Sequence, residues 1–351
     1  MANITIPVID ISSQNPSAPT QLLEAVVKYG FVFIENNAVG IPPSRISELF
    51  NLSQEFFASP QSQKAAVSIT SNKAGANHGW LGPGIEKLSV AQARPDCKEA
   101  FNMSEPLMQN GKLALQQPLP ESLQPHEGPL IEFQNACHAL CVRVLGHFAT
   151  ALGVDSAWFA ARHDRSRGRS GTVFRMLYYP YLEGVEDGVD VRAGAHSDYG
   201  SMTLLFQMPG QPGLEIKTPE GAWAPVPVDP SRGENSSPES RHEAKSSSAE
   251  NKDDAKPLPI LVNIGDLLED WTGGLLKSTV HRVIFPQGDA GDRYSMAYFL
   301  HPLDDAALEP VPSELVAQHA AKTGRKGTKR EGKTMTARDH LMERLAATYK
   351  V

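Results

Sequence analysis

A histidine and an aspartate two residues apart lie near the middle of the sequence, within Ala195-His196-Ser197-Asp198-Tyr199-Gly200. In an extended segment the side chains of His196 and Asp198 point to the same face, because side chains alternate along a strand. One imidazole and one carboxylate make up two thirds of a facial iron site, whose third ligand is a second histidine. Since the chain has 11 histidines, a lone His-x-Asp can arise by chance. The rest of the chain must complete the site.

The best candidate for the third ligand is His281, in the segment 277–283. This segment has the pattern of a strand, which can direct the imidazole at a fixed point inside the fold. Two histidines and one carboxylate leave three octahedral positions open, which suits Fe(II) binding a chelating co-substrate together with dioxygen. Zinc is the alternative, although structural zinc sites favour cysteine or more histidine and close the coordination sphere.

Arg293 and Ser295 begin the next predicted strand and share one of its faces. A guanidinium beside a hydroxyl suits a carboxylate, which the guanidinium can bind through two parallel hydrogen bonds. Tyr179, at the end of the strand that precedes the first ligand, can add another hydroxyl. Taken alone, Arg293 would be interpreted as an exposed strand arginine; beside His196 and His281 it indicates a carboxylate site.

The elements that would position these residues follow from hydrophobic periodicity and from turn residues. Helices are predicted near residues 20–29, from Pro42 and Pro43 to before Pro60, at about 129–152 and at 336–350. Strands are predicted at 4–11, 31–34, 172–179, 202–207, 213–217, 223–226, 258–264, 279–285 and 294–300, and a loop at 79–84. Many short strands without intervening helices predict an antiparallel sandwich or barrel.

Residues 230–257 interrupt the strand pattern. They are rich in Ser, Glu, Asp and Lys and contain almost no large apolar side chain, so they cannot bury enough surface to order themselves. We expect a disordered loop inserted between two strands, and a tolerated insertion rather than a regulatory segment.

Composition limits the classes of partner. A net charge of −7 over 351 residues gives no indication of nucleic-acid or membrane-surface binding. No apolar run approaches the length of a bilayer span, and the N-terminus lacks a basic start followed by an apolar stretch. Three cysteines, few and odd in number, argue against a disulfide framework, and Cys137 and Cys141 are interpreted as small core residues. We expect a cytoplasmic, monomeric protein that acts on a small molecule, with no nucleic-acid or membrane partner.

Motifs along nearly the whole chain resemble, in the family's order, the isopenicillin N synthase-like branch of the Fe(II)/2-oxoglutarate-dependent dioxygenases. Each motif alone is a weak signal, and their shared order is a strong one. They are Pro7-Val8-Ile9-Asp10, Gly30-Phe31-Val32-Phe33, Asp96-Cys97-Lys98-Glu99-Ala100-Phe101, Arg175-Met176-Leu177-Tyr178-Tyr179-Pro180, His196-x-Asp198, Val262-Asn263-Ile264-Gly265-Asp266, His281-Arg282-Val283 and Arg293-x-Ser295.

The resemblance implies an α+β fold with a double-stranded β-helix (jelly roll) core flanked by helices, and an N-terminal helical and strand region. Residues 1–125 would form the N-terminal non-haem dioxygenase region. Residues 126–305 would form the Fe(II)/2-oxoglutarate jelly-roll domain, with a linking helix and the insertion at about 230–257. Residues 306–351 would form a C-terminal helical extension.

The resemblance also implies the chemistry. His196, Asp198 and His281 would hold Fe(II), while Arg293 and Ser295, assisted by Tyr179, would bind the distal carboxylate of 2-oxoglutarate. With 2-oxoglutarate and O2 as co-substrates and ascorbate as a stimulant, such an enzyme hydroxylates, desaturates or cyclises a small organic molecule and releases succinate and CO2. The alternatives are an iron oxidase of the same fold that does not use 2-oxoglutarate, and a non-catalytic binding relative.

The sequence departs from the family pattern in two places. The gap between Asp198 and His281 is longer than usual, and the insertion at 230–257 is about long enough to account for the excess. Leu177 stands where many plant members carry an asparagine before the paired tyrosines. The substrate cannot be identified from the sequence; we expect strand residues such as Leu204 and Phe206, together with the C-terminal helix, to line its pocket.

Overall fold

The computed structural model describes residues 4–37, 39–71, 77–86, 88, 94, 96–186, 190–231, 257–286, 291–325, 329–330 and 333–348. The insertion predicted at 230–257 therefore lies outside the described residues except at its two ends. Among the described residues, no helix combines the length and the apolar character that crossing a membrane requires.

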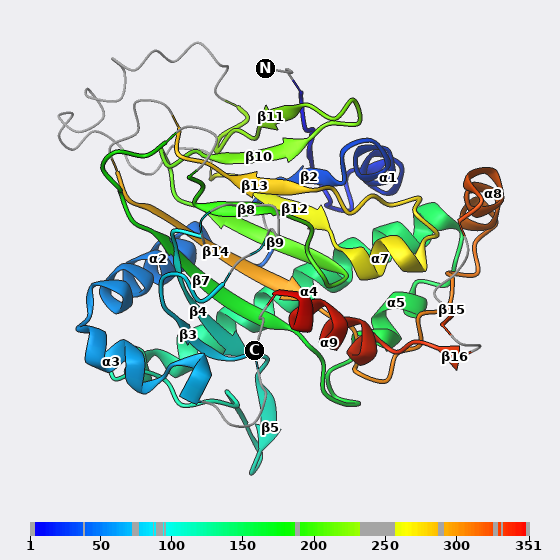
Figure 1. Ribbon diagram of the computed structural model, residues 1–351. Helices are drawn as coiled ribbons and strands as arrows, with labels where there is room; N and C mark the ends of the chain where they lie inside the picture. The colour runs from blue at the N-terminus through cyan, green and yellow to red at the C-terminus, as the bar shows by residue number, and fades with distance from the viewer. Residues whose placement is uncertain are drawn as a thin grey trace.

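Two sheets face each other and form the double-stranded β-helix (Figure 1). The large sheet contains, in spatial order, β1 (Val8–Ile9), β2 (Phe31–Ile34), β12 (Ile260–Ile264), β9 (Met202–Gln207), β14 (Arg293–Leu300), β7 (Val173–Tyr179), β4 (Glu99–Ser104) and β3 (Gly79–Leu81). The small sheet contains β11 (Trp223–Pro225), β10 (Leu214–Lys217), β13 (His281–Val283) and β8 (Ala193–His196). Two ribbons lie apart from them: β5 (Leu107–Gln109) with β6 (Lys112–Ala114), and β15 (Lys329–Arg330) with β16 (Lys333–Thr334).

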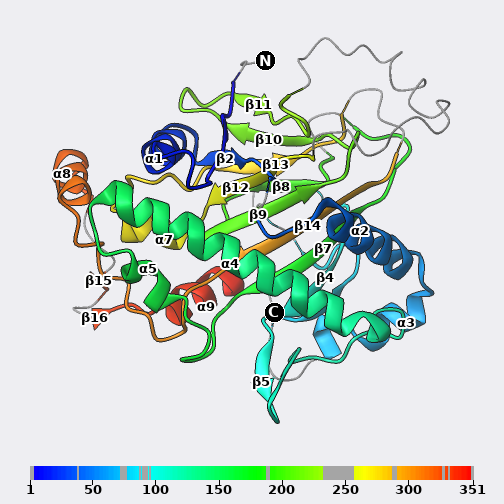
Figure 2. The same cartoon turned by 180° about the vertical axis from the view of Figure 1, so that it is seen from behind.

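Helices surround the β-helix. They are α1 (Ala18–Tyr29), α2 (Pro43–Ala58), α3 (Gln61–Ala66), α4 (Glu127–Leu152), α5 (Ala157–Arg162), α7 (Asp266–Trp271), α8 (Glu314–Thr323) and α9 (Ala337–Thr348). The long helix α4 crosses the outer face of the large sheet (Figure 2), whereas α9 lies on the opposite side (Figure 1). The large sheet therefore has one face buried under α4 and one face turned toward the small sheet and α9.

Alternation along the strands divides the core in two. In β2, Val32 and Ile34 belong to the cluster beneath the helices, whereas Phe31 and Phe33 belong to the smaller cluster between the sheets. This division is the period-two pattern of a strand that is buried on both faces.

The same alternation corrects one expectation. Leu204 and Phe206 do not line the pocket: both are buried in the cluster beneath the helices, where the Phe206 ring lies 5.1 Å from that of Phe133 on α4. Their neighbours Thr203 and Leu205 line the cavity instead. The expectation was wrong because a strand with apolar residues on both faces does not reveal which face turns inward.

The predicted helices and strands all occur, with small shifts at their ends, although the strand predicted at 4–11 is reduced to β1. The loop predicted at 79–84 is wrong in part, because β3 pairs there with β4. Trp80 supplies the reason: its side chain is buried, and its indole N–H donates to Glu99 Oε2 at 2.8 Å. The elements additional to the predicted set are strands β3, β4, β5, β6, β8, β15 and β16 and helices α3, α5, α7 and α8.

Gly30 makes the sharp turn from α1 into β2. Its φ is +69°, a conformation that glycine adopts without strain, and its N–H donates to the Val26 carbonyl at 3.0 Å. A Cβ at this position would collide with the carbonyl oxygen of Lys277. Glycine is therefore required both by the turn and by the close approach of the segment that leads to β13.

Candidate metal centre and co-substrate site

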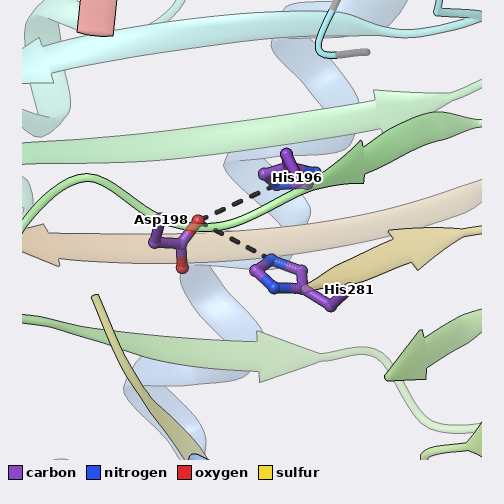
Figure 3. A group of neighbouring side chains, drawn as sticks. All are labelled: His196, Asp198 and His281. Atoms are coloured by element: carbon purple, nitrogen blue, oxygen red, sulfur yellow. Dashed lines mark ion pairs between the residues drawn. The ribbon is translucent and has the colours of Figure 1, made fainter. Parts of the chain in front are cut away.

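Three side chains converge between the sheets: His196 at the end of β8, Asp198 in the segment that follows, and His281 at the start of β13 (Figure 3). β8 and β13 pair antiparallel with His196 directly opposite His281. The pairing explains how residues 85 positions apart in sequence meet at one point, because cross-strand neighbours on one face lie about 5 Å apart. Asp198 lies two residues beyond the end of β8.

The donor atoms face a common centre. Asp198 Oδ1 lies 3.8 Å from His196 Nε2 and 3.6 Å from His281 Nε2. The Nδ1 atoms point away and donate to backbone carbonyls, that of His196 to Gly194 at 2.7 Å and that of His281 to Thr279 at 3.1 Å. These bonds fix the tautomer that leaves each Nε2 lone pair free for a metal.

Hydrogen bonds also orient the carboxylate. Asp198 Oδ2 accepts from the Thr203 hydroxyl at 2.6 Å and from the Asn263 amide at 2.7 Å. Oδ1 is thereby left to face the imidazoles. Thr203 and Asn263 were not proposed as site residues from the sequence, although Asn263 lies in one of the motifs that carried the resemblance.

A further carboxylate holds the backbone of β8. Asp96 Oδ1 accepts from the Gly194 N–H at 3.0 Å, and the carbonyl of Gly194 is the acceptor for His196 Nδ1. The orientation of His196 therefore depends on a residue nearly a hundred positions earlier in the chain. Asp96 belongs to the segment 96–101, whose motif gave a family resemblance without indicating this contact.

The protonation states suit a metal. Burial, together with the neighbouring His281, lowers the pKa of His196 to about 4, so the His196 imidazole is neutral near pH 7. Burial alone would raise the pKa of Asp198, but the two imidazoles and the two hydrogen bonds outweigh it and leave the pKa below its usual range. Two imidazole nitrogens and one carboxylate oxygen within 4.8 Å of one another are the donor set of a facial Fe(II) site, so these residues fit the metal.

We predict that removing one hydrogen bond to Asp198 weakens metal binding. Thr203→Val deletes the hydroxyl that donates at 2.6 Å, and the affinity for Fe(II) is expected to fall about 10- to 100-fold. Thr203→Ser keeps the hydroxyl and is the matched control, with an affinity close to that of the unmodified protein. Anaerobic titration with Fe(II) measures both; equal affinity in the valine and serine variants would contradict the prediction.

Arg293 and Ser295 lie together beside the metal ligands and line the same cavity. Both are buried, and Arg293 Nη1 donates to Ser295 Oγ at 3.2 Å. The guanidinium lies over the ring of Tyr179, 5.1 Å from its centre, because Arg293 and Tyr179 are opposite each other on β14 and β7. Tyr179 thus contributes its aromatic face to Arg293.

The cavity that contains these groups encloses about 1050 Å³, including its open mouth. Its walls come from both sheets and from Leu341 and Leu345 of α9, as expected for the C-terminal helix. Its lining combines the metal ligands and the Arg293–Ser295 pair with apolar side chains, which suits a co-substrate together with a small organic substrate.

His163 lies beneath the segment that carries Asp198. Its Nδ1 donates to the Phe159 carbonyl at 2.7 Å, so Nε2 accepts from the hydroxyl of Ser201 at 2.9 Å. Burial lowers the pKa of His163 to about 4. An unfolded histidine titrates near 6.5, so between about 6.5 and about 4 the unfolded chain binds a proton that the folded chain does not.

We therefore predict that the metal-free protein loses stability as the pH falls from about 6.5 toward about 4, by up to about 3 kcal/mol from His163. Urea unfolding at several pH values in this window measures the effect. His163→Gln cannot titrate and should show a shallower decline. An identical pH dependence in the two proteins would contradict the prediction.

Comparisons with known proteins show which proteins the chain resembles. Residues 6–126 match the family model described as non-haem dioxygenase in morphine synthesis N-terminal, and residues 245–302 match that of the 2OG-Fe(II) oxygenase superfamily. UPF0676 protein C1494.01 of Schizosaccharomyces pombe is 32% identical over 99% of this chain and 94% of its own length. Proline hydroxylase buaE of Petromyces alliaceus is 29% identical over 93% and 92%. The crystal structure of a full-length Neurospora crassa protein in complex with alpha-KG and thymine superposes with a TM-score of 0.73, at 28% identity over 97% and 96% of the two chains.

Proposed function

Because this chain belongs to the Fe(II)/2-oxoglutarate-dependent oxygenase superfamily, we propose that His196, Asp198 and His281 bind its Fe(II). We also propose that Arg293 and Ser295 bind the distal carboxylate of 2-oxoglutarate, with Tyr179 assisting. The protein is a 2-oxoglutarate-dependent dioxygenase that oxidises a small organic metabolite and releases succinate and CO2. Its similarity to 2-oxoglutarate-dependent enzymes argues against the non-catalytic relative and the oxidase that does without 2-oxoglutarate.

One observation carries the assignment of residues. The two Nε2 atoms and Asp198 Oδ1 face one another within 3.6–3.8 Å of the carboxylate oxygen, in the cavity that also contains Arg293 and Ser295. A facial triad leaves one side of the metal open, and the guanidinium is a buried cation in the same space. 2-Oxoglutarate that chelates the metal through its keto acid end can therefore bind Arg293 through its distal carboxylate.

The residues of the chain orient the reactants and exclude water. Bound iron supplies the redox chemistry that couples oxidative decarboxylation of 2-oxoglutarate to oxidation of the substrate. Arg293 and Ser295 fix the distal carboxylate by charge-assisted hydrogen bonds, which sets the position of the keto acid end. Tyr179 supports the guanidinium through its aromatic face. Leu341 and Leu345 of α9 give the cavity an apolar lining.

Succinate formation tests this function. Purified protein with Fe(II), 2-oxoglutarate and O2 is expected to release succinate slowly without substrate and faster with the correct one. The similar proteins guide the panel of substrates, because one is named a proline hydroxylase and the Neurospora crassa structure contains thymine. Absence of succinate under every condition would contradict the proposed function.

Three further expectations remain proposals. The chain divides at about residues 125 and 305 into an N-terminal region, the jelly-roll domain and a C-terminal extension. The protein is cytoplasmic, and it acts as a monomer without nucleic-acid or membrane partners. Their support is the order of the motifs, the sparse cysteines and the acidic net charge of −7.

A further inference from the structure

A second polar wall lines the cavity, made of Glu86, Lys98 and Arg175. The proposed iron and co-substrate sites do not use it. The three side chains are buried, with 5%, 4% and 9% of their residue surfaces exposed. Glu86 follows β3, Lys98 immediately precedes β4, and Arg175 lies in the middle of β7, so three separate segments contribute to one patch of the wall.

The wall is a closed network of charges. Lys98 Nζ lies 2.8 Å from Glu86 Oε2 and 2.7 Å from Asp96 Oδ2. Arg175 Nη1 lies 3.3 Å from both oxygens of Glu86, and its Nε donates to Asn102 Oδ1 at 2.7 Å. Asp96, which does not line the cavity, supplies the second carboxylate, so the network of two cations and two carboxylates carries no net charge as a whole. Because buried ion networks rarely add stability over apolar packing, this one indicates a role in recognition.

The remaining polar groups of the cavity either belong to the proposed iron and 2-oxoglutarate sites or are uncharged. Among the described residues, the other charged side chains that line it are Asp198 and Arg293, which the proposed function assigns to iron and to 2-oxoglutarate. His301 lines it too, and burial lowers the pKa of its imidazole to about 3, so it is uncharged. A substrate with a net charge would find no counter-charge here, and burying an unpaired charge is costly.

An uncharged substrate can use both members of the network. Arg175 offers N–H donors, and Glu86 beside it offers carboxylate acceptors, in adjacent positions. The guanidinium of Arg175 lies over the ring of Phe299, 5.6 Å from its centre, and Phe299 also lines the cavity. Aromatic and apolar surface beside a paired donor and acceptor favours a flat ring with polar atoms on one edge.

We propose that Glu86 and Arg175 form the substrate-recognition site, and that the substrate is a compact uncharged ring with an N–H beside a C=O, a cyclic amide or imide. The proposal rests on the proposed function and specifies its substrate class. The N–H of the ring donates to Glu86, its C=O accepts from Arg175, and its face packs against Phe299. Lys98 holds Glu86 in place through an ion pair, and Asp96 holds Lys98 in turn.

Succinate release with matched probes tests the proposal. The neutral probes are 2-piperidone, glutarimide and uracil; orotate adds a carboxylate to the uracil ring, and 1,3-dimethyluracil removes both N–H groups. At least one neutral probe is expected to raise succinate release about tenfold or more over the substrate-free rate, and orotate and 1,3-dimethyluracil to raise it far less. Stimulation by none of the neutral probes, or equal stimulation by orotate, would overturn the proposal.

A variant adds a readout that a merely structural role would not give. Glu86→Gln leaves Lys98 and Arg175 in excess of the carboxylates, so selectivity is expected to shift from the neutral rings toward orotate. Arg45→Gln, which removes an ion pair with Glu48 outside the cavity, is the control and should keep the original selectivity. An equal loss for every probe in Glu86→Gln would overturn the recognition role.

The two proposals can fail separately. If the unmodified protein forms no succinate even without a probe, the proposed function fails. If it forms succinate and the neutral rings do not stimulate it, only the substrate class fails. The comparison of probes on the unmodified protein needs no variant, so it remains decisive even if Glu86→Gln does not fold.

Discussion

Replacing His281 by alanine is expected to reduce succinate formation at least about a thousandfold, equivalent to about 4 kcal/mol of transition-state stabilisation. The change removes one of three protein donors and leaves a carboxylate with a single imidazole, too few ligands to hold Fe(II) at micromolar metal. The fold should survive, because the paired strands β8 and β13 keep their backbone hydrogen bonds. Succinate assays at saturating 2-oxoglutarate, with circular dichroism to monitor the fold, measure both effects.

His196→Ala should behave in the same way, since His196 is the cross-strand partner of His281. The control is His319→Ala, which removes an imidazole from α8 and should retain full activity. Substantial succinate formation by either ligand variant would contradict the assignment of the ligands. Loss of activity in the control would show that the assay responds to any loss of histidine.

Replacing Arg293 by alanine is expected to raise the KM for 2-oxoglutarate about 100-fold or more, with a smaller effect on kcat. Each hydrogen bond to a charged group contributes about 1.5–3 kcal/mol, and the guanidinium offers two of them to the carboxylate. Arg293→Lys keeps the charge but cannot form two parallel hydrogen bonds to the carboxylate. Its KM for 2-oxoglutarate should lie between that of the unmodified protein and that of Arg293→Ala. Initial rates over a range of 2-oxoglutarate concentrations give the result.

Ser295→Ala measures the contribution of the Ser295 hydroxyl to 2-oxoglutarate binding while Arg293 stays in place. It removes a single donor from the carboxylate site and should raise the KM about tenfold or less. The metal ligands are unchanged in Ser295→Ala and in both Arg293 variants, so their Fe(II) affinity should remain that of the unmodified protein. An unchanged KM in Arg293→Ala would place the carboxylate of 2-oxoglutarate elsewhere in the cavity.

The sequence indicated the architecture because its strands are short, apolar and bounded by turn residues. β9 occurs as Met202–Gln207, within the bounds that alternation predicts, and α4 begins two residues before its predicted start. The residue types of the metal ligands were predictable, because a facial iron site needs two imidazoles and one carboxylate, here His196, Asp198 and His281. Their convergence was expected from the family resemblance, whereas the pairing of β8 with β13 that produces it was not predicted.

The rest of the site could not be predicted, for physical reasons specific to each residue. Leu204 and Leu205 are equally apolar, so only tertiary packing determines that Leu205 lines the cavity. Asn263 appears as one polar residue in a buried strand, and nothing in the sequence shows that its amide reaches Asp198. Glu86 and Arg175 are 89 positions apart, and their ion pair depends on β3 pairing with β4 and on β4 pairing with β7.

Anomalous diffraction at the iron edge, from crystals grown anaerobically with Fe(II) and 2-oxoglutarate, tests the central assignment most directly. We expect one strong peak about 2 Å from His196 Nε2, His281 Nε2 and Asp198 Oδ1. We also expect the distal carboxylate of 2-oxoglutarate to bind Arg293 and Ser295. An iron peak away from these three donors, or a carboxylate bound to other residues, would contradict it.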